Sequence, residues 1–140
     1  QAKAAQPQNA LVHYYHAQCN TSLNRLDPAI EDLQTALNIG ASGKLRTQIH
    51  SQLGYVYDKK QDYDKAANAY REAGNSSKVA EMQGKATAKQ ANVQADAEQE
   101  EYRRRLAALE LQIKELEAIG EVEEANELRK QLEQLKKALP

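Results

Sequence analysis

The stretch QLGYVYDKKQDYDKAANAYREAG, residues 52–74, decides the fold. Leu53, Gly54 and Tyr57 fall on one helical face, and the polar residues KKQD then interrupt the pattern. A second helical face follows, made by Tyr63, Ala66, Tyr70 and Ala73. Two short amphipathic helices joined by a tight polar turn predict a helical hairpin. Gly54 and Ala66 leave no bulky side chain between the two backbones, so the helices can pack closely.

The composition favours helices along the whole chain of 140 residues. Ala, Gln, Glu, Leu and Lys dominate, and all five are good helix formers. The chain has only six glycines and three prolines, and Pro7, Pro28 and Pro140 interrupt no long internal segment. With 41% hydrophobic residues, the chain can bury a modest core. We therefore expect an all-α fold, built as one domain or as a few stacked repeats.

Residues 44–80 resemble a tetratricopeptide repeat (TPR), a helical hairpin that stacks with its neighbours into an α-solenoid. The residues that match the family pattern in type and spacing are Leu53, Gly54, Tyr57, Ala66, Tyr70 and Ala73. His50 stands where the family often has Trp, and Lys78 stands where it often has Pro. The resemblance implies an α-solenoid fragment made of such hairpins.

Residues 10–43 resemble a degenerate copy of the same repeat. Their second helix carries Ala29, Leu33 and Ala36, spaced as Ala66, Tyr70 and Ala73 are and beginning 37 residues earlier. The family period is ~34 residues, and the turn-rich stretch GASGK explains the excess. Ala17 then corresponds to Gly54, and His16 corresponds to Leu53. Residues 1–9, with Ala2 and Pro7 at family positions, are expected to be the remnant of an upstream repeat and its linker.

The stretch HYYHAQC, residues 13–19, is the first that could carry chemistry. His13, His16 and Cys19 share one broad helical face, and two imidazoles with a thiol are good zinc ligands. A zinc site needs a fourth ligand or an open position, and the only other histidine, His50, lies one repeat away. We therefore predict packing rather than metal binding, with Cys19 as a small hydrophobe on the packing face.

The second half departs from the repeat. Val79 and Met82 are expected to pack a new helix onto the second repeat, with Ser76 or Ser77 as its N-cap. That long helix is predicted over residues 76–119, and a return helix over 120–140 follows Gly120, which suits a helix C-cap. Both helices carry apolar residues at heptad spacing: Leu106, Leu109, Ile113, Leu116, Leu128, Leu132 and Leu135. These predict an antiparallel, coiled-coil-like hairpin, although the pairing within one chain or between two chains stays open.

Several classes of function are unsupported by the sequence. There is no Gly-rich phosphate loop, nucleophile elbow or clustered metal-ligand set, so we expect no enzyme and no cofactor. The net charge of −1 gives no general attraction to nucleic acid, and the basic run at residues 103–105 follows Glu98, Glu100 and Glu101. No apolar run reaches membrane-spanning length. A single cysteine leaves the compartment open.

The TPR resemblance implies a scaffold that binds a protein or peptide partner in a concave groove lined by the first helix of each repeat. The groove residues expected here are Tyr14, Gln18, Ser22, Gln48, Ser51, Gln52, Tyr55 and Lys59. Some family members hold a chaperone carboxylate with Lys, Asn and Arg at these places, and Tyr14, Gln18 and Gln52 depart from that set. The alternative is a structural module that self-associates through the C-terminal heptad residues, giving a homo-oligomer.

Overall fold

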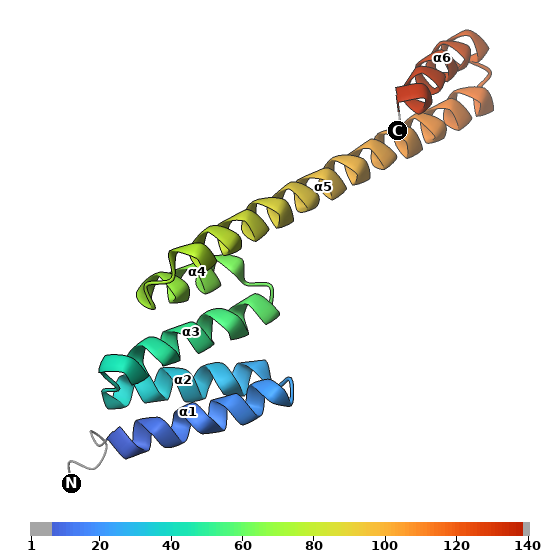
Figure 1. Ribbon diagram of the computed structural model, residues 1–140. Coiled ribbons are helices and arrows are strands. Elements are labelled where there is room, and N and C mark those ends of the chain that lie inside the picture. The colour runs from blue at the N-terminus through green and yellow to red at the C-terminus, as the bar shows by residue number, and fades with distance from the viewer. Residues whose placement is uncertain (1–6, 139–140) are drawn as a thin grey trace. The chain divides into compact units, whose positions relative to one another are not determined.

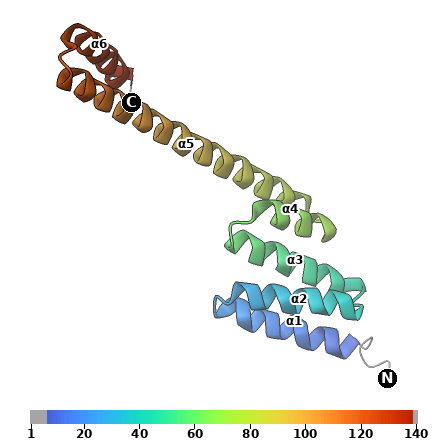
Figure 2. The ribbon, with the colours of Figure 1, turned by 180° about the vertical axis from the view of Figure 1, so that it is seen from behind.

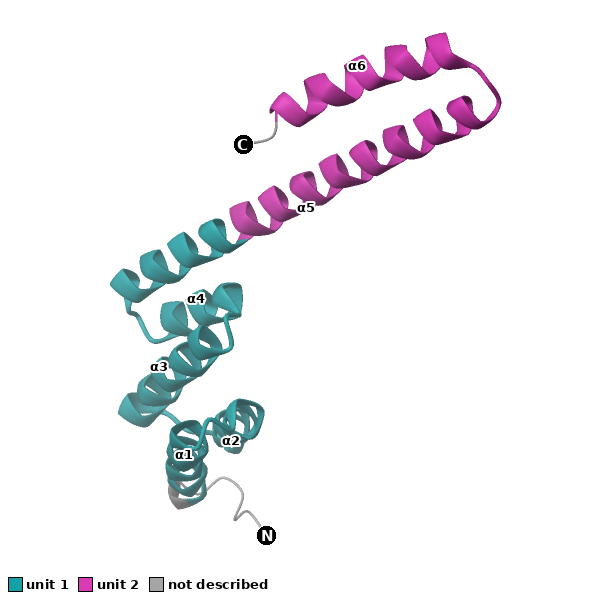
Figure 3. Cartoon of the chain, turned by 90° about the vertical axis from the view of Figure 1, so that its right-hand side faces the viewer, with its two compact units in different colours: residues 1–89 teal, residues 90–140 magenta. Residues whose placement is uncertain are grey.

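The computed structural model describes residues 7–138 and is all-α, as predicted. Its six helices are α1 (Pro7–Ser22), α2 (Leu26–Ile39), α3 (Gly43–Lys59), α4 (Tyr63–Glu72), α5 (Ser76–Ala118) and α6 (Val122–Ala138), shown in Figure 1. The chain divides into two compact units, residues 1–89 and residues 90–140 (Figure 3). Residues 1–6 of the predicted upstream remnant, Ala2 included, lie outside the described residues, whereas Pro7 is the first residue of α1.

Two helical hairpins, α1–α2 and α3–α4, follow one another in the first unit (Figures 1 and 2). Their turns are built alike and lie 37 positions apart. Asn24 and Gln61 are the only described non-glycine residues with positive φ, at 59° and 64°. The residue after each closes its turn on the preceding helix, Arg25 N donating to Asn20 O at 2.8 Å and Asp62 N to Tyr57 O at 2.9 Å. The two turns are therefore separated by the same 37 residues that the sequence pattern predicts for the two hairpins.

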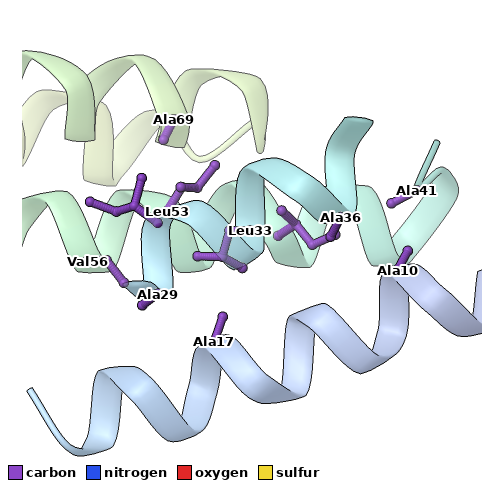
Figure 4. Packing of buried hydrophobic residues seen from close by; sticks show 11 residues of the cluster. Ala10, Ala17, Ala29, Leu33, Ala36, Ala41, Leu53, Val56 and Ala69 are labelled. Carbon is purple, nitrogen blue, oxygen red and sulfur yellow. The ribbon is translucent and has the colours of Figure 1, made fainter. Parts of the chain in front are cut away.

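Small residues let the helices of the first unit approach closely. Ala17 of α1 and Ala29 and Ala36 of α2 have no exposed surface, and they meet the fully buried Leu33 (Figure 4). The same cluster continues onto α3 through Ile49, Leu53 and Val56. Because α2 shares its apolar face between α1 and α3, the two hairpins have one continuous core.

The first turns of α5 cover the second hairpin, as expected from Val79 and Met82. Met82 is fully buried in a cluster with Ala66, Ala67 and Tyr70, and Val79 packs against this cluster. The predicted N-cap was wrong. Asn75 caps the helix instead, its side-chain Oδ1 accepting a hydrogen bond from Lys78 N at 3.1 Å. Asparagine is among the best N-cap residues, and Ser76 lies inside the helix.

The second unit is an intramolecular hairpin of α5 and α6. Gly120, with φ of 84°, makes the turn, a conformation that glycine adopts without strain. All seven predicted heptad residues lie in the second unit, and six of them share one cluster with Ala125, in which Ile113 and Leu132 are buried. Tyr102 closes the other end by donating its hydroxyl proton to Leu135 O at 3.1 Å. The hairpin interpretation of the C-terminal heptads is confirmed.

Candidate functional site

The predicted groove residues lie on two helices. Tyr14, Gln18 and Ser22 belong to α1, and Gln48, Ser51, Gln52, Tyr55 and Lys59 belong to α3. Four of the eight side chains are exposed and four are half-buried, the exposed ones being Ser22, Gln48, Tyr55 and Lys59. Half-burial fixes the position of a side chain while leaving part of it accessible to a partner.

The two helices are joined at the middle of this set. Gln52 Nε2 of α3 donates to Thr21 Oγ1 of α1 at 3.4 Å. Thr21 is itself buried and donates its hydroxyl proton to the carbonyl oxygen of Ala17 at 2.8 Å. Sequence reasoning missed Thr21, although a hydroxyl at the penultimate position of a helix is a common partner for backbone and side-chain groups. This hydrogen bond places Gln52 of α3 beside the C-terminal end of α1.

Each half of this surface carries a tyrosine held by a neighbour. Tyr14 OH accepts a hydrogen bond from Gln18 Nε2 at 3.1 Å. On α3, Lys59 Nζ lies 5.3 Å from the centroid of the Tyr55 ring, within range of a cation–π interaction. Tyr55 is 45% exposed. The surface thus presents aromatic rings, amides and one positive charge, groups suited to hydrogen bonding and stacking rather than to bond cleavage.

The histidines of the first helix are organised by a residue that sequence reasoning also missed. Asp32 of α2 lies 2.6 Å from His16 Nδ1 and 3.4 Å from His13 Nδ1, and it accepts a hydrogen bond from Asn20 Nδ2 at 2.9 Å. Its side chain is only 15% exposed. The one signal in the sequence was that Asp32 directly precedes Leu33, a residue at a packing position, so that its carboxylate was placed near the interface between the helices. Within residues 7–138, no group of three or more His, Cys, Asp or Glu residues is arranged to hold a metal ion.

The expected burial of His16 and Cys19 was wrong. The His16 side chain is 65% exposed, and Cys19 is exposed as well. The reason is clear from the second hairpin, where Val56 occupies the position equivalent to Cys19 and is fully buried in the core that α3 shares with α2. No described helix covers the corresponding face of α1, so its side chains remain accessible.

His50 of α3 is buried among the packed helices, 8% exposed, and its Nε2 atom has no hydrogen-bond partner in the described structure. Burial lowers the pKa of this imidazole below its ordinary value of 6.5, and the nearby Arg46 lowers the pKa further, while Glu72 opposes both. The neutral form is therefore the one that the fold accommodates. His50 contributes to packing and lies outside the predicted binding set.

The predicted self-association residues are engaged within one chain. Leu106, Leu109, Leu116 and Leu128 are half-buried around Ile113, Ala125 and Leu132. Ion pairs flank this core: Arg129 with Glu117, and Lys136 with Glu110 at 3.9 Å. The apolar seam is therefore occupied by the hairpin itself.

Comparison with known proteins identifies one part of the chain. The tetratricopeptide repeat family model matches residues 47–73, the segment that forms most of α3 and all of α4. No curated protein and no solved structure matches the chain. In residues 7–138, no helix has the length and apolar character needed to span a membrane. The match and the all-helical hairpins agree with the pattern around Gly54 and Tyr70, and the chain is a tetratricopeptide-repeat-containing protein.

Proposed function

We propose that the first unit is a non-catalytic scaffold that binds a segment of a partner protein on the surface formed by α1 and α3. Tetratricopeptide repeats generally mediate protein–protein interaction, which makes this the function that the matched family favours. The observation that supports the proposal is the Gln52–Thr21 hydrogen bond, which joins α3 to α1 at one of the predicted groove residues.

The chemistry of the surface indicates the kind of segment it suits. Lys59 is the only charged side chain among the eight predicted groove residues, and it is held over Tyr55. Amide side chains such as Gln18, Gln48 and Gln52 can both donate and accept, as a peptide backbone does. An uncharged or weakly acidic segment with backbone groups available for hydrogen bonding is therefore the partner expected.

Selection of random displayed peptides on the immobilised full chain tests the proposal. Tyr14→Ala and Tyr55→Ala should each weaken the binding of the selected peptides about tenfold or more, because tyrosines at interface centres commonly contribute more than 1.4 kcal/mol. Val12→Ala is the control, since Val12 is a 65% exposed residue of α1 outside the predicted set, whereas the Tyr15 ring lies 5.6 Å from the ring of Tyr14. Circular dichroism verifies that each variant remains helical.

Peptides whose affinity is unchanged in both Tyr14→Ala and Tyr55→Ala would show that binding takes place elsewhere. Equal losses in all three variants would show that the substitutions act on the stability of α1 and α3 rather than on the contact. Loss in the two groove variants with retention in Val12→Ala is the result that the proposal requires.

A further inference from the structure

The second unit carries two grooves on the same face of α5. One lies at the closed end of the hairpin and has a volume of about 530 Å³. It is lined by Gln112, Glu115 and Leu116 of α5, by Ile119 in the turn that follows, and by Glu124 and Leu128 of α6. We call it the tip groove. The other lies at the open end, has a volume of about 180 Å³ and is lined by Glu98, Glu101, Tyr102 and Arg105. We call it the base groove.

The two grooves are related by the heptad repeat. Gln112, Glu115, Leu116 and Ile119 each lie 14 positions after a residue of the base groove, so that Tyr102 corresponds to Leu116 and Arg105 to Ile119. Fourteen residues are two heptads, which return to nearly the same side of a helix, ~21 Å further along its axis. If two such hairpins pack antiparallel on this side, the tip groove of each lies opposite the base groove of the other, so that both contacts form together.

The tip groove leaves an apolar side chain without cover. Ile119 is 73% exposed, the highest exposure of any large hydrophobic residue in residues 7–138. It adjoins Leu116 and Leu128, which are half-buried in the hairpin core. Covering Ile119 and the adjoining leucines with an apolar or aromatic surface of another molecule would remove apolar area from water, which is favourable in free energy.

Charge is distributed unequally along the hairpin. Residues 110–127, around the turn, contain seven Glu and one Lys. The residues toward the open end, 98–109 and 128–138, contain seven Arg or Lys and four Glu, three of which precede Tyr102, so this end has a net positive charge and the turn a net negative one. Some of these charges are paired within the chain, as in the ion pair between Lys136 and Glu110. Glu115 and Glu124 of the tip groove have no ion pair within the described structure, and neither has Lys137 near the open end.

The base groove fits an apolar insertion. Its carboxylates are already satisfied, since Glu101 pairs with Arg105 at 3.0 Å and Glu98 accepts a hydrogen bond from Gln94 at 3.4 Å. Its aromatic ring, Tyr102, is fixed by the hydroxyl hydrogen bond to Leu135 O. A fixed ring beside a small recess is a favourable contact for a branched aliphatic side chain.

We propose that this face of the hairpin binds the same face of a second copy of the chain, with the two hairpins antiparallel. Ile119 of each copy inserts into the base groove of the other beside Tyr102, and the acidic turn of each copy lies against the basic open end of the other. Such a contact is isologous, so twofold symmetry forms both insertions together and closes the dimer. It uses a surface separate from the seam, which is filled within each chain.

Sedimentation of the full chain over a range of concentrations, at low and at physiological salt, tests this. The wild type should dimerise reversibly, and higher salt should weaken the dimer by screening the charges. Ile119→Lys and, separately, the double variant Glu115→Lys with Glu124→Lys should each weaken it about tenfold or more. Leu111→Lys is the matched control: Leu111 is 58% exposed but lines neither groove, about 80° around α5 from Ile119.

A dimer that survives Leu111→Lys and dissociates in Ile119→Lys supports the proposal. A wild type that remains monomeric over the whole range overturns it and leaves the groove to a helix of another protein. A dimer that is unaffected by Ile119→Lys, or equally weakened by Leu111→Lys, also overturns it. Since Ile119 is exposed, its replacement should leave the helical content unchanged, which circular dichroism checks.

Discussion

The ring of Tyr70 lies directly over Gly54, so that a Cβ built on this glycine would be only 2.7 Å from three of the ring carbons. Tyr70 is 5% exposed, and its ring is packed with Ala66 and Met82. The ring therefore has little space into which it could move. This contact explains physically why a glycine in the middle of α3 faces an aromatic residue in α4: the ring occupies the volume that any other side chain would need.

Gly54→Ala should accordingly destabilise the first unit by about 1–3 kcal/mol, the usual cost of overpacking a core. Gly84→Ala is the control, because Gly84 lies in α5 with no atom near its added Cβ. That variant should be neutral or stabilising by up to about 1 kcal/mol, the helix-propensity gain. Urea denaturation of the wild type and both variants measures these changes in the free energy of unfolding. Equal changes in the free energy of unfolding for Gly54→Ala and Gly84→Ala would show that the Tyr70 contact is not a determinant of stability.

A double-mutant cycle separates the contact from helix propensity. In a Tyr70→Ala background, which is itself less stable, Gly54→Ala should lose its penalty because the ring is gone. The coupling between the two positions should then be of the order of 1 kcal/mol or more, as residues in direct contact often show. Additive effects of the two substitutions would contradict the packing explanation.

His50 should make stability depend on pH. Because its pKa is lowered in the folded chain, the unfolded chain binds a proton more readily in mildly acidic solution. The free energy of unfolding should therefore fall as the pH drops through the ordinary value of 6.5 and continue to fall until the folded-state pKa is passed. His50→Leu should flatten this part of the profile and, by removing the unpartnered Nε2 atom, should leave stability at neutral pH unchanged or increased.

The measurement is the difference between the two unfolding profiles, wild type and His50→Leu, from pH 7.5 to 5. Taking the difference cancels the contributions of all groups other than His50, which both proteins share. A wild-type profile parallel to that of His50→Leu would contradict the assignment of a buried, neutral imidazole.

Zinc should not bind specifically to the first helix. His13 and His16 both direct Nδ1 toward Asp32, and Cys19 is exposed on a face with no described helix over it. Isothermal titration of the reduced chain with zinc should show no stoichiometric binding below micromolar Kd. Stoichiometric, submicromolar binding that disappears in His13→Ala would reverse this conclusion.

The hairpin of the second unit can be measured with spin labels at positions 101 and 137. Lys136, next to position 137, pairs with Glu110, so the two labels should lie within about 20 Å of each other. In a helix that continued straight through Gly120 they would be separated by ~54 Å, at ~1.5 Å for each residue. Labelled chains diluted with an excess of unlabelled chains report the intramolecular distance alone, and a long distance there would reject the hairpin.

The parts of the fold that the sequence predicted are those with a local or periodic signal. The heptad leucines and Gly120 located the α5–α6 hairpin, and the shared spacing of Ala29 and Ala66 located two hairpins with matching turns. The N-cap of α5 was misplaced by one or two residues because Asn75, Ser76 and Ser77 are all competent caps. Only the geometry of the turn selects among them.

Burial on α1 was not predictable in the same way. Cys19 was expected to be buried because it shares a helical face with His13 and His16 that was interpreted as the packing face of the repeat. Burial of that position depends on a neighbouring helix rather than on the residue itself, as the buried Val56 at the equivalent position of α3 shows. Asp32 and Thr21 were missed for a related reason. Each acquires its role from side chains on another helix, His16 and Gln52 respectively, and helical periodicity contains no information on such pairs.

We propose that the surface of α1 and α3 receives a partner segment. Titration of the isotope-labelled full chain with a peptide selected on it, followed by amide and side-chain chemical shifts, tests this claim residue by residue. We expect the largest shifts at Tyr14, Gln18, Gln52 and Tyr55, with small changes in α6. Shifts concentrated around Ile119 and Leu128, with Tyr14 and Tyr55 unaffected, would contradict it.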